Sequence, residues 1–221
     1  MLGDDSRTPM KHRFPDHLTS ARLRLRRLQP DDAEALCAYR GLPEVARFQS
    51  WDSFGPDDAA DLIASQLVAE FDVPGTWFQL AIIHAATGTV IGDCGLHCRK
   101  EDPRQMELGI TLSPRHQGRR YADELVECLL DYLFGRLDKH RIFASVDVLN
   151  RPAAALCRRL GFRQEAHLVE HLWIKGQWSS KYVFAMLQRE WEERRAPRAA
   201  TPGQARERTA PASITADIEH L

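Results

Sequence analysis

The sequence lacks a long apolar run and a strong net charge. No stretch of about 18 consecutive apolar residues occurs, and residues 1–14 contain no apolar segment of the kind that a signal peptide needs. The 30 basic and 31 acidic residues of the 221-residue chain nearly cancel, so no global field favours nucleic acid or a membrane surface. These absences predict a cytoplasmic protein that binds neither nucleic acid nor membrane and that holds any anion at a local site.

The cysteines also lack the pattern of a disulfide framework. There are five, an odd number without paired spacing. The densest cluster runs from Cys94 to Cys98 and includes His97. On a strand, alternation would place the two cysteines on one face and His97 on the other, and tetrahedral zinc needs further ligands nearby. We therefore predict strand packing and no metal site.

The two ends of the chain differ from its middle in composition. Residues 1–18 are polar and irregular, and residues 193–221 are rich in Ala, Pro, Arg and Thr. Such segments cannot bury enough apolar surface to order themselves. We predict a flexible N-terminal tail over 1–18, one α/β domain over 19–192 and a disordered C-terminal tail over 193–221.

Within this domain, periodic patterns predict alternating strands and helices. The first strand begins at Arg22, and a helix follows over 31–41 with Asp31 as its cap. A strand, a crossover helix and a second strand form a right-handed parallel unit, so strands 106–112 and 141–148 should lie side by side. The other predicted elements are a helix within 55–71, two strands joined at Thr87-Gly88, a helix over 121–134, a short helix after Asn150 and a hairpin around Lys175-Gly176.

The turn "QGRRYA", residues 117–122, leads from a strand directly into a helix. This order presents unpaired backbone amides and the positive end of the helix dipole, which suit a phosphate or pyrophosphate. Most turns of this kind bind no ligand, and the Gly-Lys-Ser/Thr of a P-loop is absent. The surrounding segments must therefore decide what the turn does.

These segments resemble one family. The run "ELGITLSPRHQGRRYADE", followed by "NRPAAALCRRLGF", resembles the acetyl-CoA-binding core of the GNAT acetyltransferases. The opening segments "TSARLRLRRLQPDDAEAL" and "LPEVARF" resemble the branch that contains the Rim ribosomal-protein N-terminal acetyltransferases. The resemblance spans about residues 19–191. It implies a GNAT fold, in which a mixed, mostly antiparallel seven-stranded sheet is splayed between two central parallel strands and carries helices on both faces.

The resemblance also implies a site for acetyl-CoA as cosubstrate. The pantetheine arm of CoA would lie in the splay, and Asn150 would bond to it there. An alternative role for Asn150 is simply to cap the following helix. Backbone groups of two strand residues and the turn would hold the rest of the cosubstrate, through Ile110, Leu112, Gln117, Gly118, Arg119, Arg120, Tyr121 and Ala122.

Three residues depart from the family pattern. Arg120 occupies the position of the family's central glycine, and Ala153 and Cys157 occupy positions where relatives often carry serine and tyrosine. At a helix start we expect an ordinary φ for Arg120, whose guanidinium either points outward or adds a charge-assisted bond to phosphate. The tyrosine serves as an acid in some relatives, so water or Cys157 would replace it, unless Cys157 is only a small core residue.

The implied reaction is transfer of an acetyl group to a primary amine by direct attack in a ternary complex. A lysine-like amine has a pKa near 10 and needs a base. Glu107 matches a position where family members carry this carboxylate, although a surface ion pair is an alternative role for it. Asp93 and His171 are the other candidate bases.

The acceptor and the assembly state stay open at this point. A protein N-terminus, an aminoglycoside and a polyamine are all compatible acceptors, because family membership predicts fold better than substrate. The chain could act as a monomer or a homodimer. An alternative function is that of an acyl-CoA-binding sensor or interaction module with little turnover, which the substitutions at Arg120, Ala153 and Cys157 would favour.

Overall fold

The computed structural model describes residues 12–196, and the predicted tail segments 1–11 and 197–221 lie outside the described residues. The described chain forms one sheet with the strand order β1-β2-β3-β4-β5-β6-β8-β7. Every neighbouring pair is antiparallel except β5 with β6, which is parallel. The strands are β1 Leu18–Thr19, β2 Leu23–Arg27, β3 Trp77–His84, β4 Val90–Cys98, β5 Gln105–Leu112, β6 Arg141–Asp147, β7 Arg163–Ile174 and β8 Gln177–Leu187.

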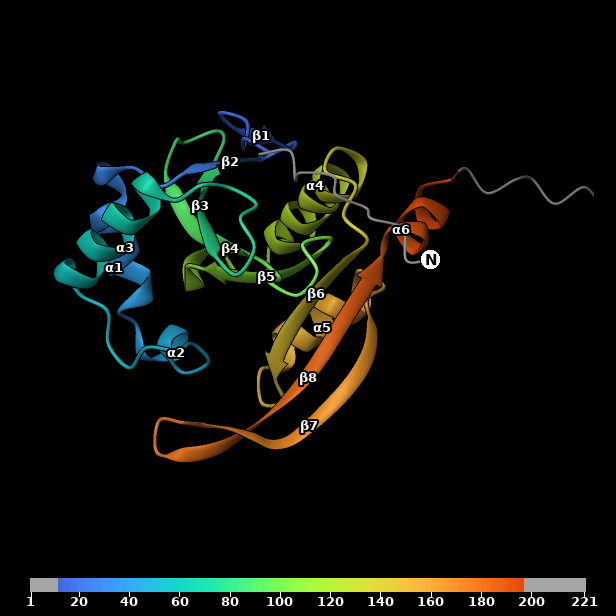
Figure 1. The fold of residues 1–221 in the computed structure, drawn as a ribbon. Helices are drawn as coiled ribbons and strands as arrows, with labels where there is room; N and C mark the ends of the chain where they lie inside the picture. The colour runs from blue at the N-terminus through green and yellow to red at the C-terminus, as the bar shows by residue number, and fades with distance from the viewer. Residues whose placement is uncertain (1–11, 197–221) are drawn as a thin grey trace, which may run out of the picture.

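The helices connect these strands and cover both faces of the sheet. Two short 3-10 turns precede α1 and α4, at Pro30–Asp32 and Pro114–His116. In Figure 1, α1, α2 and α3 lie together at one end of the sheet, and α4 and α5 lie against its middle. The α-helices are α1 Ala33–Arg40, α2 Pro43–Ala46, α3 Pro56–Val68, α4 Tyr121–Gly135, α5 Arg151–Arg159 and α6 Gln188–Arg195.

The sheet confirms the predicted mixed α/β architecture, with one strand more than the expected seven. The additional strand is β1, a two-residue segment that pairs with β2. So short a segment has no periodicity of its own to read in the sequence.

Two hydrophobic clusters lie on opposite faces of the sheet. On β3, Phe78, Leu80 and Ile82 belong to the larger cluster with α4 and α5, whereas Ala81 and Ile83 belong to the smaller cluster with α1 and α3. This alternation follows from the two-residue period of a strand. On β4 it also places Cys94 and Cys98 in the larger core, while His97 stacks on Trp77 across the sheet.

The packed chain extends beyond both predicted domain boundaries. Phe14, within the predicted tail 1–18, is 3% exposed and packs against Phe71, Phe78 and Tyr132. At the other end, α6 continues to Arg195 and buries Trp191. The described structure thus includes a buried residue within 12–18 and a helix that continues past 192, because a single aromatic in a polar segment can anchor it when a pocket is available.

The entry to α1 corrects another expectation. Asp32, rather than Asp31, holds this turn, because its carboxylate accepts from the backbone N–H of Gln29 at 2.8 Å. The same carboxylate accepts hydrogen bonds from Nη1 and Nη2 of Arg26, at 2.7 and 2.8 Å. Adjacent aspartates cannot be distinguished by sequence pattern alone, since only the fold decides which one faces Arg26.

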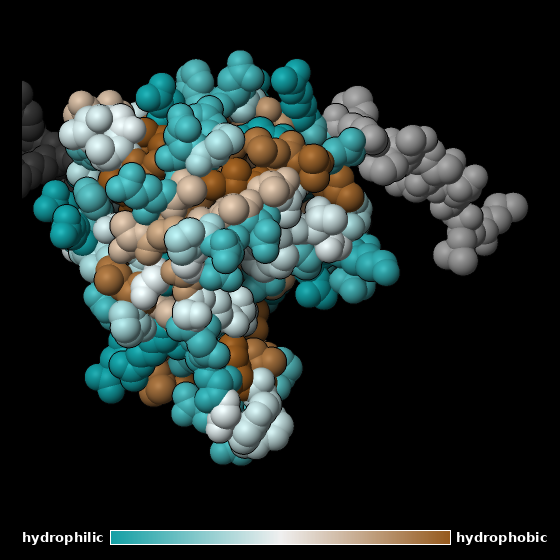
Figure 2. Space-filling view, turned by 90° about the vertical axis from the view of Figure 1, so that its left-hand side faces the viewer, coloured by the Kyte–Doolittle hydropathy of each residue, from teal (hydrophilic) through white to brown (hydrophobic). Residues whose placement is uncertain are grey.

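The side of the molecule that carries α1 and α3 presents apolar side chains interspersed with hydrophilic ones (Figure 2). The apolar residues of α3 include Leu67 and Val68, which are 51% and 82% exposed at the end of that helix. Over residues 12–196, no helix combines the length and the apolar character that crossing a membrane requires.

Candidate active site

Strands β5 and β6 part after a short parallel contact and leave a cavity between them. Their pairing covers only 105–107 against 141–143, although β5 runs on to Leu112 and β6 to Asp147. A cavity of about 630 Å³ lies where the strands diverge. Residues 108–112 and 144–147 line its two sides, and α4 and α5 contribute side chains to it. The predicted splay between two parallel strands is therefore present.

The edge of β5 that faces this cavity carries unpaired backbone groups. The N–H of Ser113 donates to the carbonyl of Ile91 on β4 at 2.9 Å. Because backbone groups alternate sides along a strand, Ile110 and Leu112 direct theirs away from β4 and toward β6. The carbonyl of Leu112 already accepts from Nε2 of Gln117 at 2.9 Å, so its N–H is the group left for a ligand. This edge can accept an extended chain as an additional strand would pair.

The turn between β5 and α4 forms a cradle of backbone amides. In the described part of the chain, no N–H from Gly118 to Ala122 donates to a protein acceptor. Gly118 has φ +75°, and a Cβ at this position would meet nothing within 4 Å. The turn therefore leaves open space beside several free donors at a helix N-terminus, the arrangement that binds an anion.

Arg120 in this turn contradicts one expectation. Its φ is 62° and its ψ 19°, in the left-handed region, whereas its place at a helix start predicted an ordinary φ. A left-handed residue other than glycine costs about 1–2 kcal/mol. Glycine adopts this left-handed conformation without strain, which explains the glycine of the family pattern at this position. In this chain the same conformation is adopted by an arginine and is strained.

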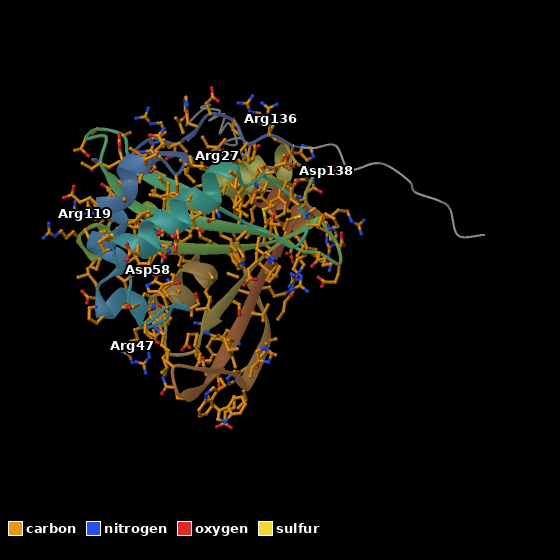
Figure 3. All side chains as sticks on the ribbon, turned by 60° about the vertical axis from the view of Figure 1, so that its left-hand side comes forward. Arg27, Arg47, Asp58, Arg119, Arg136 and Asp138 are labelled. Carbon is orange, nitrogen blue, oxygen red and sulfur yellow. The ribbon has the colours of Figure 1, made fainter. Side chains whose placement is uncertain are left out.

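The side chains of the turn take different directions. Arg119 is exposed and points away from the body of the protein (Figure 3). The Arg120 side chain is 71% exposed, and its Nη1 lies 3.5 Å from Oδ1 of Asp123. Of the predicted cosubstrate-binding residues, Arg119 alone does not line the cavity; the others, Ile110, Leu112, Gln117, Gly118, Arg120, Tyr121, Ala122 and Asn150, do.

Asn150 caps a helix and also lines the cavity. Its Oδ1 accepts from the N–H of Ala153 at 3.2 Å, which makes it the N-cap of α5. It also lines the cavity together with Ala153 and Cys157. Burial raises the pKa of the Cys157 thiol to about 11, so this thiol stays protonated at neutral pH.

Glu107 lies at the point where the two strands part. It is the last β5 residue paired with β6, opposite Phe143, and its antiparallel partner on β4 is His97. Burial raises the pKa of Glu107, and the smaller opposing effects come from His97, Arg99 and a hydrogen bond from the backbone of Ser145. Glu107 does not line the cavity itself, but its neighbour Leu108 and Ser145 do.

The two other candidate bases differ in their surroundings. Asp93 is fully buried and accepts hydrogen bonds from the Tyr39 hydroxyl at 2.6 Å, from the Arg40 guanidinium and from the Gln79 amide. These contacts occupy both of its carboxylate oxygens, so Asp93 serves as the anchor of a buried network. His171 is exposed in an irregular stretch of β7.

One carboxylate that lines the cavity, Asp147, was missed in the sequence. Asp147, at the end of β6, lines the cavity and accepts from Ser179 Oγ at 2.6 Å and from Lys181 Nζ at 3.3 Å. Burial alone would raise the pKa of Asp147, but these contacts and the N–H of Leu149 outweigh it and lower the pKa. Only the pairing of β6 with β8 brings these residues together, so no local motif marks them.

Helix α2 and the segment after it also line the cavity. Glu44, Val45, Phe48 and Gln49 line it, and Gln49 Nε2 donates to Thr111 Oγ1 on β5 at 3.1 Å. Sequence reasoning did not locate these residues. The helix α2 has only four residues, and the contact between Gln49, which follows it, and β5 joins positions 62 apart in the chain.

The tip of the β7-β8 hairpin reaches this same segment, as the long hairpin extending toward α2 in Figure 1 indicates. Lys175 Nζ donates to the carbonyls of Ala46 and Trp51 at 2.7 and 2.5 Å. The guanidinium carbon of Arg40 lies 4.5 Å from the centre of the Trp51 ring. Because Arg40 donates to Asp93, this contact connects the segment to the Asp93 network. This part of the cavity wall is thus held by contacts between distant parts of the chain.

The comparisons with known proteins agree with this geometry. Residues 22–163 match the family described as the acetyltransferase (GNAT) domain. The chain belongs to the GNAT acetyltransferases. This finding confirms the family expected from the loop and the helix after Asn150, and with it acetyl-CoA as cosubstrate and N-acetyltransferase as the class of enzyme.

Among GNAT relatives, the uncharacterized N-acetyltransferase p20 of Bacillus licheniformis is 33% identical over 79% of this chain and 97% of its own length. YdaF of Bacillus subtilis, whose name proposes a ribosomal N-acetyltransferase, is 24% identical over 80% of this chain and 94% of YdaF. A solved structure of spermidine N-acetyltransferase from Vibrio cholerae, in complex with CoA and spermine, is similar with a TM-score of 0.67. It is 25% identical and covers 78% of this chain and 99% of that one.

Proposed function

We propose that this N-acetyltransferase transfers the acetyl group to a primary amine by direct attack in a ternary complex, with Glu107 as general base. The observation that carries this proposal is the position of Glu107 at the point where β5 and β6 part, with a pKa raised by burial. A carboxylate whose pKa lies closer to neutral is a more effective base for an ammonium group than an ordinary one.

The cosubstrate half of the cavity supports the placement of acetyl-CoA. The free edge of β5 at Ile110 and Leu112 suits the pantetheine arm, and Asn150 stands beside it with its cap bond already made. The amides of Gly118 to Ala122 suit the pyrophosphate. Cavity volume, open space at Gly118 and unpaired donors are what a bound CoA requires.

When bound, acetyl-CoA supplies a thioester whose carbonyl carbon accepts the amine nitrogen, while the C–S bond breaks and releases the thiolate. Glu107 would take a proton from the acceptor ammonium, directly or through water, and so free the amine lone pair that attacks the thioester. The N–H of Ile110 faces the gap and would stabilise the developing oxyanion. A buried thiol at Cys157 and water are the proton donors available to the leaving thiolate.

The acceptor side supports a cationic amine. Glu44 and Asp147 line this part of the cavity as carboxylates, and the pKa of Asp147 is lowered. Negative groups at a cavity attract an ammonium and raise its local concentration. Polyamines and peptide N-termini are the first acceptors to test, because the relatives named above bind spermine or are named for ribosomal acetylation.

The test is release of free thiol from acetyl-CoA in the presence of spermidine, peptides with free N-termini and an aminoglycoside. Glu107→Gln should lower kcat/KM by about 10²- to 10⁴-fold without changing the Kd for CoA. A carboxylate base works only when ionised, so kcat/KM of the wild type should rise with pH through the raised pKa of Glu107. This limb should vanish in the variant.

Glu101→Gln is the matched control, because Glu101 is 71% exposed in a surface pair with Arg99. It should leave the kinetics unchanged. Undiminished activity of Glu107→Gln across pH would remove Glu107 as the base. Tight CoA binding without thiol release on any amine would instead favour the sensor function.

A further inference from the structure

The pyrophosphate turn is held from outside the cavity by a residue just before β2. Arg22 Nη1 donates to the carbonyl of Arg119 at 3.1 Å, and the Arg22 guanidinium carbon lies 4.5 Å from the centre of the Tyr121 ring. Its Nε donates to Oε2 of Glu124 at 2.6 Å. One guanidinium therefore contacts three residues of the turn and of the first turn of α4, which packs beside β2 (Figure 1).

Glu124 completes this arrangement. Its Oε1 accepts from Ser20 Oγ and from the backbone N–H of Arg22, both at 2.6 Å. Burial alone would raise the pKa of Glu124, but the hydrogen bonds from Ser20 and Arg22 outweigh it and hold the pKa below its ordinary value. We call Arg22 and Glu124, with these contacts, the clamp. Neither residue lines the cavity.

The contact with Arg119 fixes the direction of the next amide. A trans peptide is planar, so its carbonyl and its N–H point in opposite directions. The carbonyl of Arg119 and the N–H of Arg120 belong to one peptide. Because Arg22 holds that carbonyl on the outer side, the N–H of Arg120 is directed toward the cavity that Arg120 lines.

The turn needs such support because of its backbone. Gly118 and Arg120, on either side of Arg119, both have positive φ values, of 75° and 62°. Arg120 has a Cβ and is strained in that conformation. Without an external contact, the peptide between Arg119 and Arg120 could turn over and relieve the strain, which would direct a carbonyl instead of an amide at the anion.

We propose that Arg22 and Glu124 are positioning residues that hold the Arg120 amide toward the pyrophosphate of CoA and so set the affinity for the cosubstrate. The inference rests on the proposed role of residues 118–122 as the pyrophosphate site. It assigns a binding role to two residues that touch neither the cavity nor the reacting groups.

A surface ion pair and simple helix-end electrostatics would each behave differently from the clamp. An ordinary surface ion pair would matter little for binding, and Arg22 is 44% exposed, so its contribution to folding stability is small. Simple electrostatics would assign Glu124 an unfavourable role, because a carboxylate in the first turn of α4 repels a phosphate at the same helix end. The clamp predicts that removing the Glu124 charge weakens CoA binding, whereas electrostatics predicts that it strengthens binding.

The experiment measures the Kd for CoA and the KM for acetyl-CoA and for acetyl-pantetheine, which lacks the pyrophosphate. Arg22→Lys keeps the charge but loses the fork that reaches Arg119 and Glu124 together. Arg22→Lys and Glu124→Gln should each raise the Kd for CoA about tenfold, the effect of roughly one well-oriented contact. The KM for acetyl-pantetheine should stay unchanged.

Arg26→Lys is the matched control. Arg26 lies on β2 and forms a forked pair with Asp32, far from the turn. This variant should bind CoA as the wild type does. Thermal unfolding of all variants checks that each remains folded, and Gly118→Ala provides a direct lesion of the turn at a positive φ.

The outcomes separate the two proposals. If Gly118→Ala weakens CoA binding and the two clamp variants do not, the clamp is refuted and the pyrophosphate site stands. If none of these three variants changes the Kd for CoA, residues 118–122 are not the pyrophosphate site, and both proposals are refuted. Tighter CoA binding by Glu124→Gln, or equal losses with CoA and acetyl-pantetheine, would also overturn the inference.

Discussion

The two ends of the cavity are built in different ways. At the proposed cosubstrate end, the turn 117–122 and the N-terminus of α5 are short continuous segments, so residues close in sequence line the cavity together. At the proposed acceptor end, the lining residues of α2 and of the segment after it are held by the hairpin tip at Lys175 and by the Asp93 network, which come from distant parts of the chain. The proposed cosubstrate end therefore depends on contacts between residues close in sequence, and the proposed acceptor end on contacts between distant residues.

This difference bears on what each end can recognise. A cradle of backbone amides depends on conformation more than on side-chain identity, so it can bind the same cosubstrate in many sequences. The acceptor end depends on side chains such as Gln49 and Lys175 and on the segments that they hold. Substrate differences among relatives are therefore expected at the acceptor end.

The largest expected effect is a loss of unfolding free energy when the buried network behind the proposed acceptor end is disrupted. Asp93→Asn would leave the Arg40 guanidinium without its counter-charge in a site where the side chains of Arg40 and Asp93 are 7% and 0% exposed. Removing one partner of a buried ion pair costs about 3–5 kcal/mol of unfolding free energy. Urea denaturation, followed by tryptophan fluorescence, measures this loss.

Glu101→Gln serves as the control for this stability measurement too, since its pair with Arg99 is exposed and worth about 0–1 kcal/mol. A loss for Asp93→Asn no larger than that of the control would mean that the buried network does not hold the acceptor end.

The same division explains what could be predicted from the sequence. The turn and the cap at Asn150 follow local patterns, the splay was implied by the family resemblance, and the structure contains each of them. The left-handed φ of Arg120 was not predicted, because a helix start allows an ordinary φ and only the path of the turn excludes it. Phe14, Asp147 and Lys175 were missed because their roles depend on partners far away in the chain.

The second effect is a change in the KM for the acceptor without a change in the Kd for CoA. Lys175→Met removes two charge-assisted hydrogen bonds to the carbonyls of Ala46 and Trp51. Bonds of this kind contribute about 1.5–3 kcal/mol when buried and less when partly exposed. The KM for the acceptor should rise about tenfold with an unchanged Kd for CoA. Lys100→Met, at an exposed position, is the control. A change in CoA affinity without a change in acceptor KM would contradict the division.

The smallest effect is expected for a substitution in the turn 117–122, at the proposed cosubstrate end. Arg120→Gly removes the strain of a left-handed residue, about 1–2 kcal/mol, against about 0.5–1 kcal/mol for the greater chain entropy of glycine. The variant should therefore gain up to about 1.5 kcal/mol of unfolding free energy. Its Kd for CoA should rise about two- to fivefold, since one exposed charge beside phosphate is lost. A loss of stability would show that the Arg120 side chain supports the turn.

The most direct test of the central claim is a structure of the protein with CoA bound. We predict the pyrophosphate at hydrogen-bond distance, about 2.7–3.2 Å, from amides of residues 118–122. The pantetheine arm should lie along Ile110 and Leu112, with the thiol directed toward Glu107. Phosphates held only by arginine side chains, or a pantetheine arm outside the gap between β5 and β6, would contradict the account.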